Sequence, residues 1–167
     1  MPLHARRLLP LAAGLAALAV AVPPADATPH ICGKAVIEHS LIAAGKLTVT
    51  DVKLGMGVDL IRCGDVTGDG VTDAVFTIAS GGTAGDIRFG VVKGTSGKVV
   101  LIKPGYKVGI ARHDSRSFDI LQPHYGPNDP NCCPTSFREQ RYTWTGSRFT
   151  GGPLKKLKSA PHRFYKP

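Results

Sequence analysis

Three aspartates within nine residues are the side chains of this sequence best suited to binding a metal ion. Asp65, Asp69 and Asp73 are spaced four residues apart in CGDVTGDGVTDAVF, residues 63–76. Ca²⁺ takes about six to eight oxygen ligands, and alternate residues of a tight loop can supply them. Gly70 permits the positive φ that a sharp bend needs. We therefore predict a Ca²⁺ site with ligands from loop positions 1, 3, 5, 7 and 9: Asp65, Thr67, Asp69, the Val71 carbonyl and Asp73.

This loop is not an EF-hand. An EF-hand needs a bidentate glutamate at position 12, where this sequence has Phe76. The alternative to an ion site is a polar turn before a buried strand, because aspartate and glycine are common turn residues. Three carboxylates would then repel one another with no ion to balance them. We expect the ion to hold a turn between strands and to do no chemistry.

The loop resembles the D-x-[DN]-x-D-G-x-x-D calcium loops of FG-GAP and VCBS-type repeats. Asp65, Asp69, Gly70 and Asp73 match that pattern, and Thr67 stands where Asn or Asp is usual. Repeats of that type build propellers only in several copies, and this sequence contains the motif once. The resemblance therefore implies a calcium-type loop and no propeller.

A second resemblance covers more of the chain, from about Ile31 to Thr150. The segment CGDVTGDGVTDAVFTIASGGTAG and the later NCCPTSFREQRYTWTGSRF resemble small exported actinobacterial proteins related to the LppP/LprE lipoproteins. Those proteins combine such a loop with a C-C-P motif and a closing Tyr/Trp strand. The lipid-attachment cysteine is missing here, so membrane anchoring is not implied. The resemblance implies a fold and an exported location, without an activity.

The first residues are typical of a secretory signal peptide. Arg6 and Arg7 precede an apolar run, Leu8–Val22, and small residues at 25–27 predict cleavage after Ala27. The run is shorter than the ~20 residues of a membrane span, and no second apolar segment suggests a transmembrane span in the mature chain. We predict a secreted protein and favour the general secretory route, with the twin-arginine route left open by the paired arginines. Residues 28–150 then form one disulfide-tied domain, and residues 151–167 a basic, flexible tail.

Four cysteines remain after export: Cys32, Cys63, Cys132 and Cys133. An even number in an oxidising compartment indicates disulfide bonds, and four cysteines allow three pairings. A bridge between the neighbours Cys132 and Cys133 closes a small strained ring, so we rank that pairing last. We expect Cys32 and Cys63 each to pair with one member of the vicinal pair, and the sequence leaves open which one.

The chain is basic, with 21 Lys and Arg residues, 12 Asp and Glu residues and a net charge of +9. Such a balance favours anionic partners. Most lysines are spread singly, and only the tail is dense in positive charge. We predict no specific nucleic-acid partner; an anionic cell-envelope polymer would bind through the tail residues Lys155, Lys156, Lys158, Arg163 and Lys166.

The pattern of apolar residues predicts a helix over 34–44, followed by strands. Short segments rich in β-branched residues alternate with glycine and proline turns. They lie near residues 57–63, 74–80, 86–92, 98–102, 106–112, 117–123, 137–144 and 148–150. We predict an α+β fold that is mainly β: an antiparallel meander sheet or open barrel with one N-terminal helix.

No motif of an enzyme is present in the sequence. It contains no nucleophile elbow, no H-E-x-x-H and no phosphate-binding loop. By residue type alone, the best catalytic set combines His124 or His113 with Asp119 and Ser117. We therefore predict a secreted, non-enzymatic, calcium-stabilised module of binding or structural type. The alternatives are a secreted hydrolase of unknown substrate and a cationic binder of cell-envelope polyanions.

Overall fold

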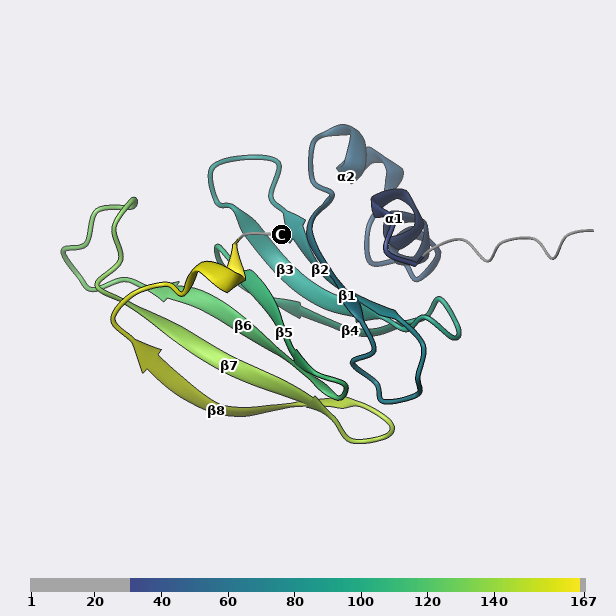
Figure 1. The fold of residues 1–167 in the computed structure, drawn as a ribbon. Coiled ribbons are helices and arrows are strands. Elements are labelled where there is room, and N and C mark those ends of the chain that lie inside the picture. The colour runs from purple at the N-terminus through teal and green to yellow at the C-terminus, as the bar shows by residue number, and fades with distance from the viewer. Residues whose placement is uncertain (1–30, 166–167) are drawn as a thin grey trace, which may run out of the picture.

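The computed structural model describes residues 31–165 (Figure 1). The predicted signal peptide, its cleavage site at Ala27, and Lys166 lie outside this range. Among the described residues, no helix is long and apolar enough to cross a membrane.

Two helices open the described chain. The main helix, α1 (Lys34–Ala43), is close to the predicted 34–44 and ends before Gly45, whose φ is +64°. A short helix, α2 (Val49–Lys53), follows. It begins with a capping box in which the hydroxyl of Thr48 accepts the N–H of Asp51, while the Asp51 carboxylate accepts the N–H of Thr48.

The strands form two antiparallel sheets, and a 3₁₀ turn, η1 (His162–Phe164), ends the described chain. The first sheet has the order β1 (Val58–Gly64), β2 (Asp73–Ala79), β3 (Asp86–Val92) and β4 (Val99–Pro104). The second sheet has the order β5 (Gly109–Asp114), β6 (Ser117–His124), β7 (Ser136–Trp144) and β8 (Phe149–Leu157). Each sheet is a meander, because consecutive strands are neighbours throughout.

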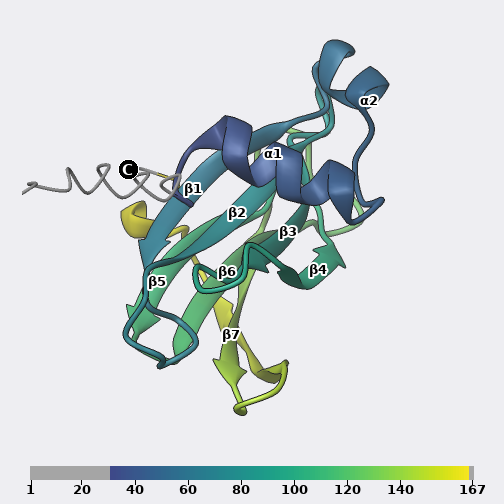
Figure 2. The same cartoon turned by 90° about the vertical axis from the view of Figure 1, so that its right-hand side faces the viewer.

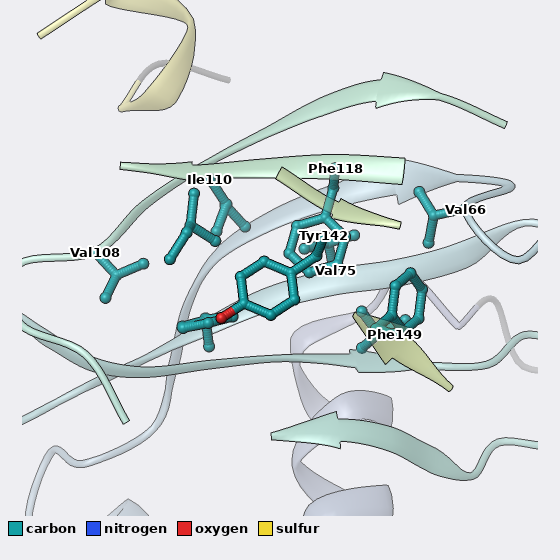
Figure 3. Close-up of a cluster of buried hydrophobic side chains, with 10 residues drawn as sticks. Val66, Val75, Val108, Ile110, Phe118, Tyr142 and Phe149 are labelled. Atoms are coloured by element: carbon teal, nitrogen blue, oxygen red, sulfur yellow. The ribbon is translucent and has the colours of Figure 1, made fainter. Parts of the chain in front are cut away.

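The main core lies between the two sheets, and four aromatic rings dominate it: Phe89, Phe118, Tyr142 and Phe149 (Figure 3). Phe118 and Tyr142, opposite each other on β6 and β7, stack with ring centroids 5.5 Å apart. Phe89 of β3 meets Tyr142 edge-on at 5.2 Å. Side chains alternate along a strand, so these residues define one face of the second sheet, here called its inner face.

Helix α1 covers the other side of the first sheet (Figure 2). Its buried residues Ile37 and Leu41 pack with Val58, Phe76 and Ile78. Strand β2 is therefore buried on both faces, which explains why apolar residues occupy both faces of the strand, with Thr77 as a buried polar exception.

The prediction of a mainly β fold with antiparallel strands and one main N-terminal helix is confirmed. The structure has two packed sheets where we expected one sheet or an open barrel. The chain leaves the first sheet at Pro104, whose ring cannot donate to a further ladder. It turns through Gly105 and through Lys107, the one described non-glycine residue with positive φ (+46°), before β5 begins.

The prediction of a flexible tail after residue 150 is wrong for the described residues. Strand β8 continues to Leu157 and pairs with β7. Beyond it, Phe164 is fully buried against Ala111 and Leu121 on the outer face of the second sheet. The segment lacks a clear pattern of its own because Gly151, Gly152 and Pro153 interrupt the alternation within β8.

The predicted disulfide pairing is also wrong. The bridges are Cys32–Cys63 and Cys132–Cys133, and no described cysteine is free. Cys32 precedes α1 and Cys63 lies at the end of β1, so the packing of α1 on the first sheet brings them together. The loop that holds Cys132 and Cys133 joins β6 to β7 on the far side of the molecule (Figure 1). In the chain-entropy model, the Cys32–Cys63 bridge contributes about 3–4 kcal/mol.

Candidate functional sites: the aspartate loop and the basic face

The aspartate loop joins β1 to β2, and its first carboxylate is surrounded by backbone N–H groups. Oδ1 of Asp65 accepts hydrogen bonds from the N–H groups of Thr67 (3.2 Å), Gly68 (2.6 Å) and Asp69 (3.3 Å). Its Oδ2 accepts the N–H of Gly70 at 3.0 Å. Gly68 and Gly70 have φ of +69° and +80°, which lets the backbone curl around the carboxylate.

The last aspartate of the loop is buried and joins two turns. Oδ2 of Asp73 accepts the N–H groups of Val66 (2.9 Å) and Thr67 (3.0 Å). Oδ1 accepts the N–H of Gly94 (2.8 Å), which lies in the turn between β3 and β4. A side chain at Gly94 would collide with the Thr72 carbonyl. The close approach of the two turns therefore requires glycine there.

The middle aspartate, Asp69, is paired with a lysine. Its Oδ1 accepts the N–H of Val71 at 3.0 Å, and its Oδ2 lies 3.1 Å from Nζ of Lys93 and accepts the Thr95 hydroxyl at 3.2 Å. Partial burial opposes ionisation. The hydrogen bonds from Val71 and Lys93 outweigh it and hold the pKa of Asp69 below its ordinary value.

These contacts do not fit a calcium cage. Among residues 31–165, no group of three His, Cys, Asp or Glu side chains is placed to hold one metal ion. The carboxylates of the predicted ligands Asp65, Asp69 and Asp73 face N–H groups and a lysine. The hydroxyl of Thr67 is buried with no hydrogen-bond partner in the described structure, but a neutral hydroxyl is a single weak ligand. Calcium binding therefore stays a prediction.

The catalytic set that residue types suggested is only partly brought together. Nδ1 of His113 lies 3.6 Å from Oδ2 of Asp119. The hydroxyl of Ser117, in contrast, donates to Asp114 at 2.8 Å, and Nε2 of His124 lies 3.3 Å from Arg138. Among the described residues, no serine hydroxyl forms a hydrogen bond with the His113–Asp119 pair, so the pair has no nucleophile to activate.

Asp119 and Glu139 hold arginines on the outer face of the second sheet. Oδ1 of Asp119 accepts Nε of Arg141 at 2.8 Å, and the same arginine reaches Nδ1 of His113 at 2.8 Å. Glu139 accepts Nη2 of Arg163 at 3.0 Å. Arg163 precedes the buried Phe164, so this ion-pair network seats the C-terminal segment on the sheet.

A basic surface lies on the inner face of the second sheet, where β6, β7 and β8 extend beyond the first residue of β5. We call it the basic face and define it by His124, Arg138, Lys156 and Lys158. Arg138 and Lys156 are directly opposite each other on β7 and β8, so their side chains share one face. Lys156 and Lys158 border a surface cavity of about 540 Å³, together with Thr135, Ser136 and Leu157. No carboxylate lines this cavity.

The basic residues that the sequence analysis named in the tail lie on both faces of the second sheet, according to the register of β8 against β7. Lys155 lies on the outer face, opposite Glu139, and Arg163 is held by the same Glu139. Of the four predicted tail residues that the structure describes, Lys156 and Lys158 belong to the basic face. Sequence reasoning missed Arg138, which the alternation of FREQRYTW places on the face of Tyr142.

Comparisons with known proteins identified no relative of this chain. No protein-family model, no curated protein and no solved structure matches the chain. The resemblances to calcium-loop repeats and to exported lipoproteins therefore stay predictions.

Proposed function

We propose that the mature chain is a secreted, non-enzymatic module that binds an anionic polymer of the cell envelope. The observation that carries the proposal is the basic face, where Arg138, Lys156 and Lys158 gather with no acidic side chain within ion-pair distance among residues 31–165. A cluster of unpaired cations raises the local concentration of anionic ligands.

The acidic residues do not offset this surface, because many are directed toward the protein's own donors. Asp65 and Asp73 accept N–H groups within the aspartate loop. Asp129 accepts the N–H groups of Gly126 and Thr135, and Asp51 caps α2. The positive charge is thus more exposed than the net charge alone implies.

A simpler explanation for lysines on β8 is that they protect an edge strand from pairing with another sheet. That explanation suffices for Lys155 and Lys156. It does not account for Arg138, which lies on β7 with strands on both sides. It also leaves unexplained why no carboxylate lines the cavity beside Lys156 and Lys158.

The exported location rests on the predicted signal peptide and is supported by the disulfide bonds, which persist in oxidising compartments. The sequence motif predicts calcium stabilisation of the aspartate loop, but the hydrogen bonds and the ion pair of its carboxylates do not support it, and polymer binding does not depend on it.

Binding of the secreted form to anionic and neutral polymers tests the proposal. We expect binding to polyphosphate and to polygalacturonate, no binding to dextran, and a marked loss of affinity when salt is raised from about 50 to 300 mM. Isothermal titration calorimetry at both salt concentrations measures this. Equal binding to dextran, or no binding to either anionic polymer at low salt, would overturn the proposal.

A further inference from the structure

The cations of the inner face do not converge on one point. Along β7, the residues that share this face are Tyr142, Gln140, Arg138 and Ser136. A strand rises about 3.4 Å per residue, so these four positions span roughly 20 Å. Figure 1 shows β7 and β8 continuing past the part of the second sheet that faces β1–β4.

Cationic groups occur at intervals along this span. Nζ of Lys103, from β4, lies 6.0 Å from the centre of the Tyr142 ring. Farther along β7, Arg138 lies opposite Lys156. At the end of the span, Lys158 borders the cavity that Ser136 also lines. Lys103, Arg138, Lys156 and Lys158 are all exposed, and none has an acidic partner among the described ion pairs.

We propose that Lys103, Arg138, Lys156 and Lys158 form a basic track that binds a linear polyanion laid along β7 and β8. This inference rests on the proposed function and names its ligand class: a chain with an anionic group on successive units, as in a phosphodiester or a polyuronate. A compact anion would engage only the Arg138–Lys156 pair and leave Lys103 without a role.

The surroundings of the track suit a chain with carbon units between its charges. Leu154 lies on the same face as Lys156, two residues before it, and its side chain is 58% exposed. Gln122 lies opposite Arg138 and adds an amide to the same face. An exposed leucine between cations provides apolar contact for the ligand's backbone, whereas a purely ionic site would not need it.

The molecule supplies a matched control for the track. Lys155 is on the same strand but points to the outer face. Lys53 is the last residue of α2 and Lys46 precedes that helix; both are exposed, on the helical side of the first sheet. Replacing these three residues removes the same charge as replacing three residues of the track.

The test compares Lys103→Gln/Arg138→Gln/Lys156→Gln with Lys46→Gln/Lys53→Gln/Lys155→Gln in the secreted form. The probes are orthophosphate, polyphosphates of increasing length and oligogalacturonates, titrated at several salt concentrations. We expect wild-type affinity to rise with chain length until the ligand covers roughly 20 Å. The track variant should bind about tenfold more weakly, and its slope of log K against log salt should be shallower by about two. The control variant should lose less than about threefold and keep its slope.

The outcomes separate the two proposals. Equal losses in both triple variants, with unchanged thermal unfolding, would leave polymer binding in place but overturn the track. Orthophosphate binding as tight as that of the longest chain would also overturn it. Absence of wild-type binding to every anionic chain would overturn the proposed function itself. Binding of only polyphosphate or only oligogalacturonate would support the track and identify the anionic group.

Discussion

The aspartate loop and the basic track each gather charges of one sign, and the protein treats them in opposite ways. In the loop, seven backbone N–H groups and the ammonium of Lys93 surround the carboxylates of Asp65, Asp69 and Asp73. In the track, no described acidic side chain comes within ion-pair distance of the cations. The negative cluster therefore belongs to the fold, and the positive cluster is available to a partner.

The chemistry of the two side chains explains this difference. An aspartate is short and accepts hydrogen bonds, so a loop can fold its own N–H groups around it. A lysine has a long stem and only donates. The lysines of the track extend from the sheet into solvent, so their ammonium groups are left to water. Acidic clusters in tight loops thus indicate structure more readily than basic clusters on strands.

The largest effect should come from removing the buried aspartate of the loop. Asp73→Ala leaves the N–H groups of Val66, Thr67 and Gly94 without their acceptor in a buried place. We expect a loss of about 3–5 kcal/mol in the free energy of unfolding, because each unsatisfied buried N–H costs ~1–3 kcal/mol. Urea denaturation followed by circular dichroism measures the loss.

Asp69→Ala is the matched control, because it removes a carboxylate of the same loop that faces Lys93 near the surface. The loss in the free energy of unfolding caused by Asp69→Ala should stay within about 1 kcal/mol. If both variants lost the same small amount, the loop would not be held by its internal acceptors, and the contrast with the track would fail.

Replacing Asp86 should have a smaller effect on the free energy of unfolding than Asp73→Ala, and it should stabilise the protein. Burial raises the pKa of Asp86 most, a hydrogen bond from the Thr77 hydroxyl opposes the shift, and nearby Asp59 adds to it, so that the pKa is about 6. The folded protein therefore holds this proton more tightly than the unfolded chain. The corresponding stability is complete below about pH 4 and is lost as the pH rises toward and past 6.

Asp86→Asn should consequently stabilise the protein by about 1–2 kcal/mol at pH 8 and change little at pH 4. The free energy of unfolding in urea at the two pH values measures this. Asp129→Asn is the contrasting variant. Hydrogen bonds from the Thr135 hydroxyl and the Gly126 N–H lower the pKa of Asp129, so that variant should lose stability at pH 8. Equal stability of Asp86→Asn and the wild type at both pH values would mean that Asp86 is not destabilised by ionisation.

Local patterns predicted the elements of this fold well. The helical spacing of Ile37 and Leu41 indicated α1, and the mainly apolar, β-branched segment after Asp73 indicated the strand β2. The alternation of residues in β7 is consistent with the burial of Tyr142 in the core. In each case, the residues that determine the element lie within one turn or strand, so the sequence contains the whole signal.

Features that depend on a distant partner could not be predicted in this way. Asp73 accepts the N–H of Gly94, twenty-one residues away, and nothing in the loop itself indicates that donor. Alternation along β8 separates Lys155 from Lys156, but which of the two lies on the inner face depends on the register of β8 against β7. The pairing of Cys32 with Cys63 depends on how α1 packs on the first sheet. A signal that was available and missed is Thr48 three residues before Asp51, the capping box that begins α2.

The smallest expected effect is that of calcium on thermal unfolding, and it tests the contrast between the two regions most directly. Binding at a Kd of ~1 mM would add about 1.4 kcal/mol at ~10 mM calcium, which is a rise of several degrees in Tm. Because the carboxylates of Asp65, Asp69 and Asp73 are already engaged by N–H groups and Lys93, we expect a change of less than about 1 °C relative to chelator at matched ionic strength. Differential scanning calorimetry of the wild type and of Asp69→Ala measures it. A rise of several degrees that disappears in Asp69→Ala would mean that these side chains turn from the backbone to an ion. The loop would then be a ligand site like the basic track, and the distinction drawn between them would no longer hold.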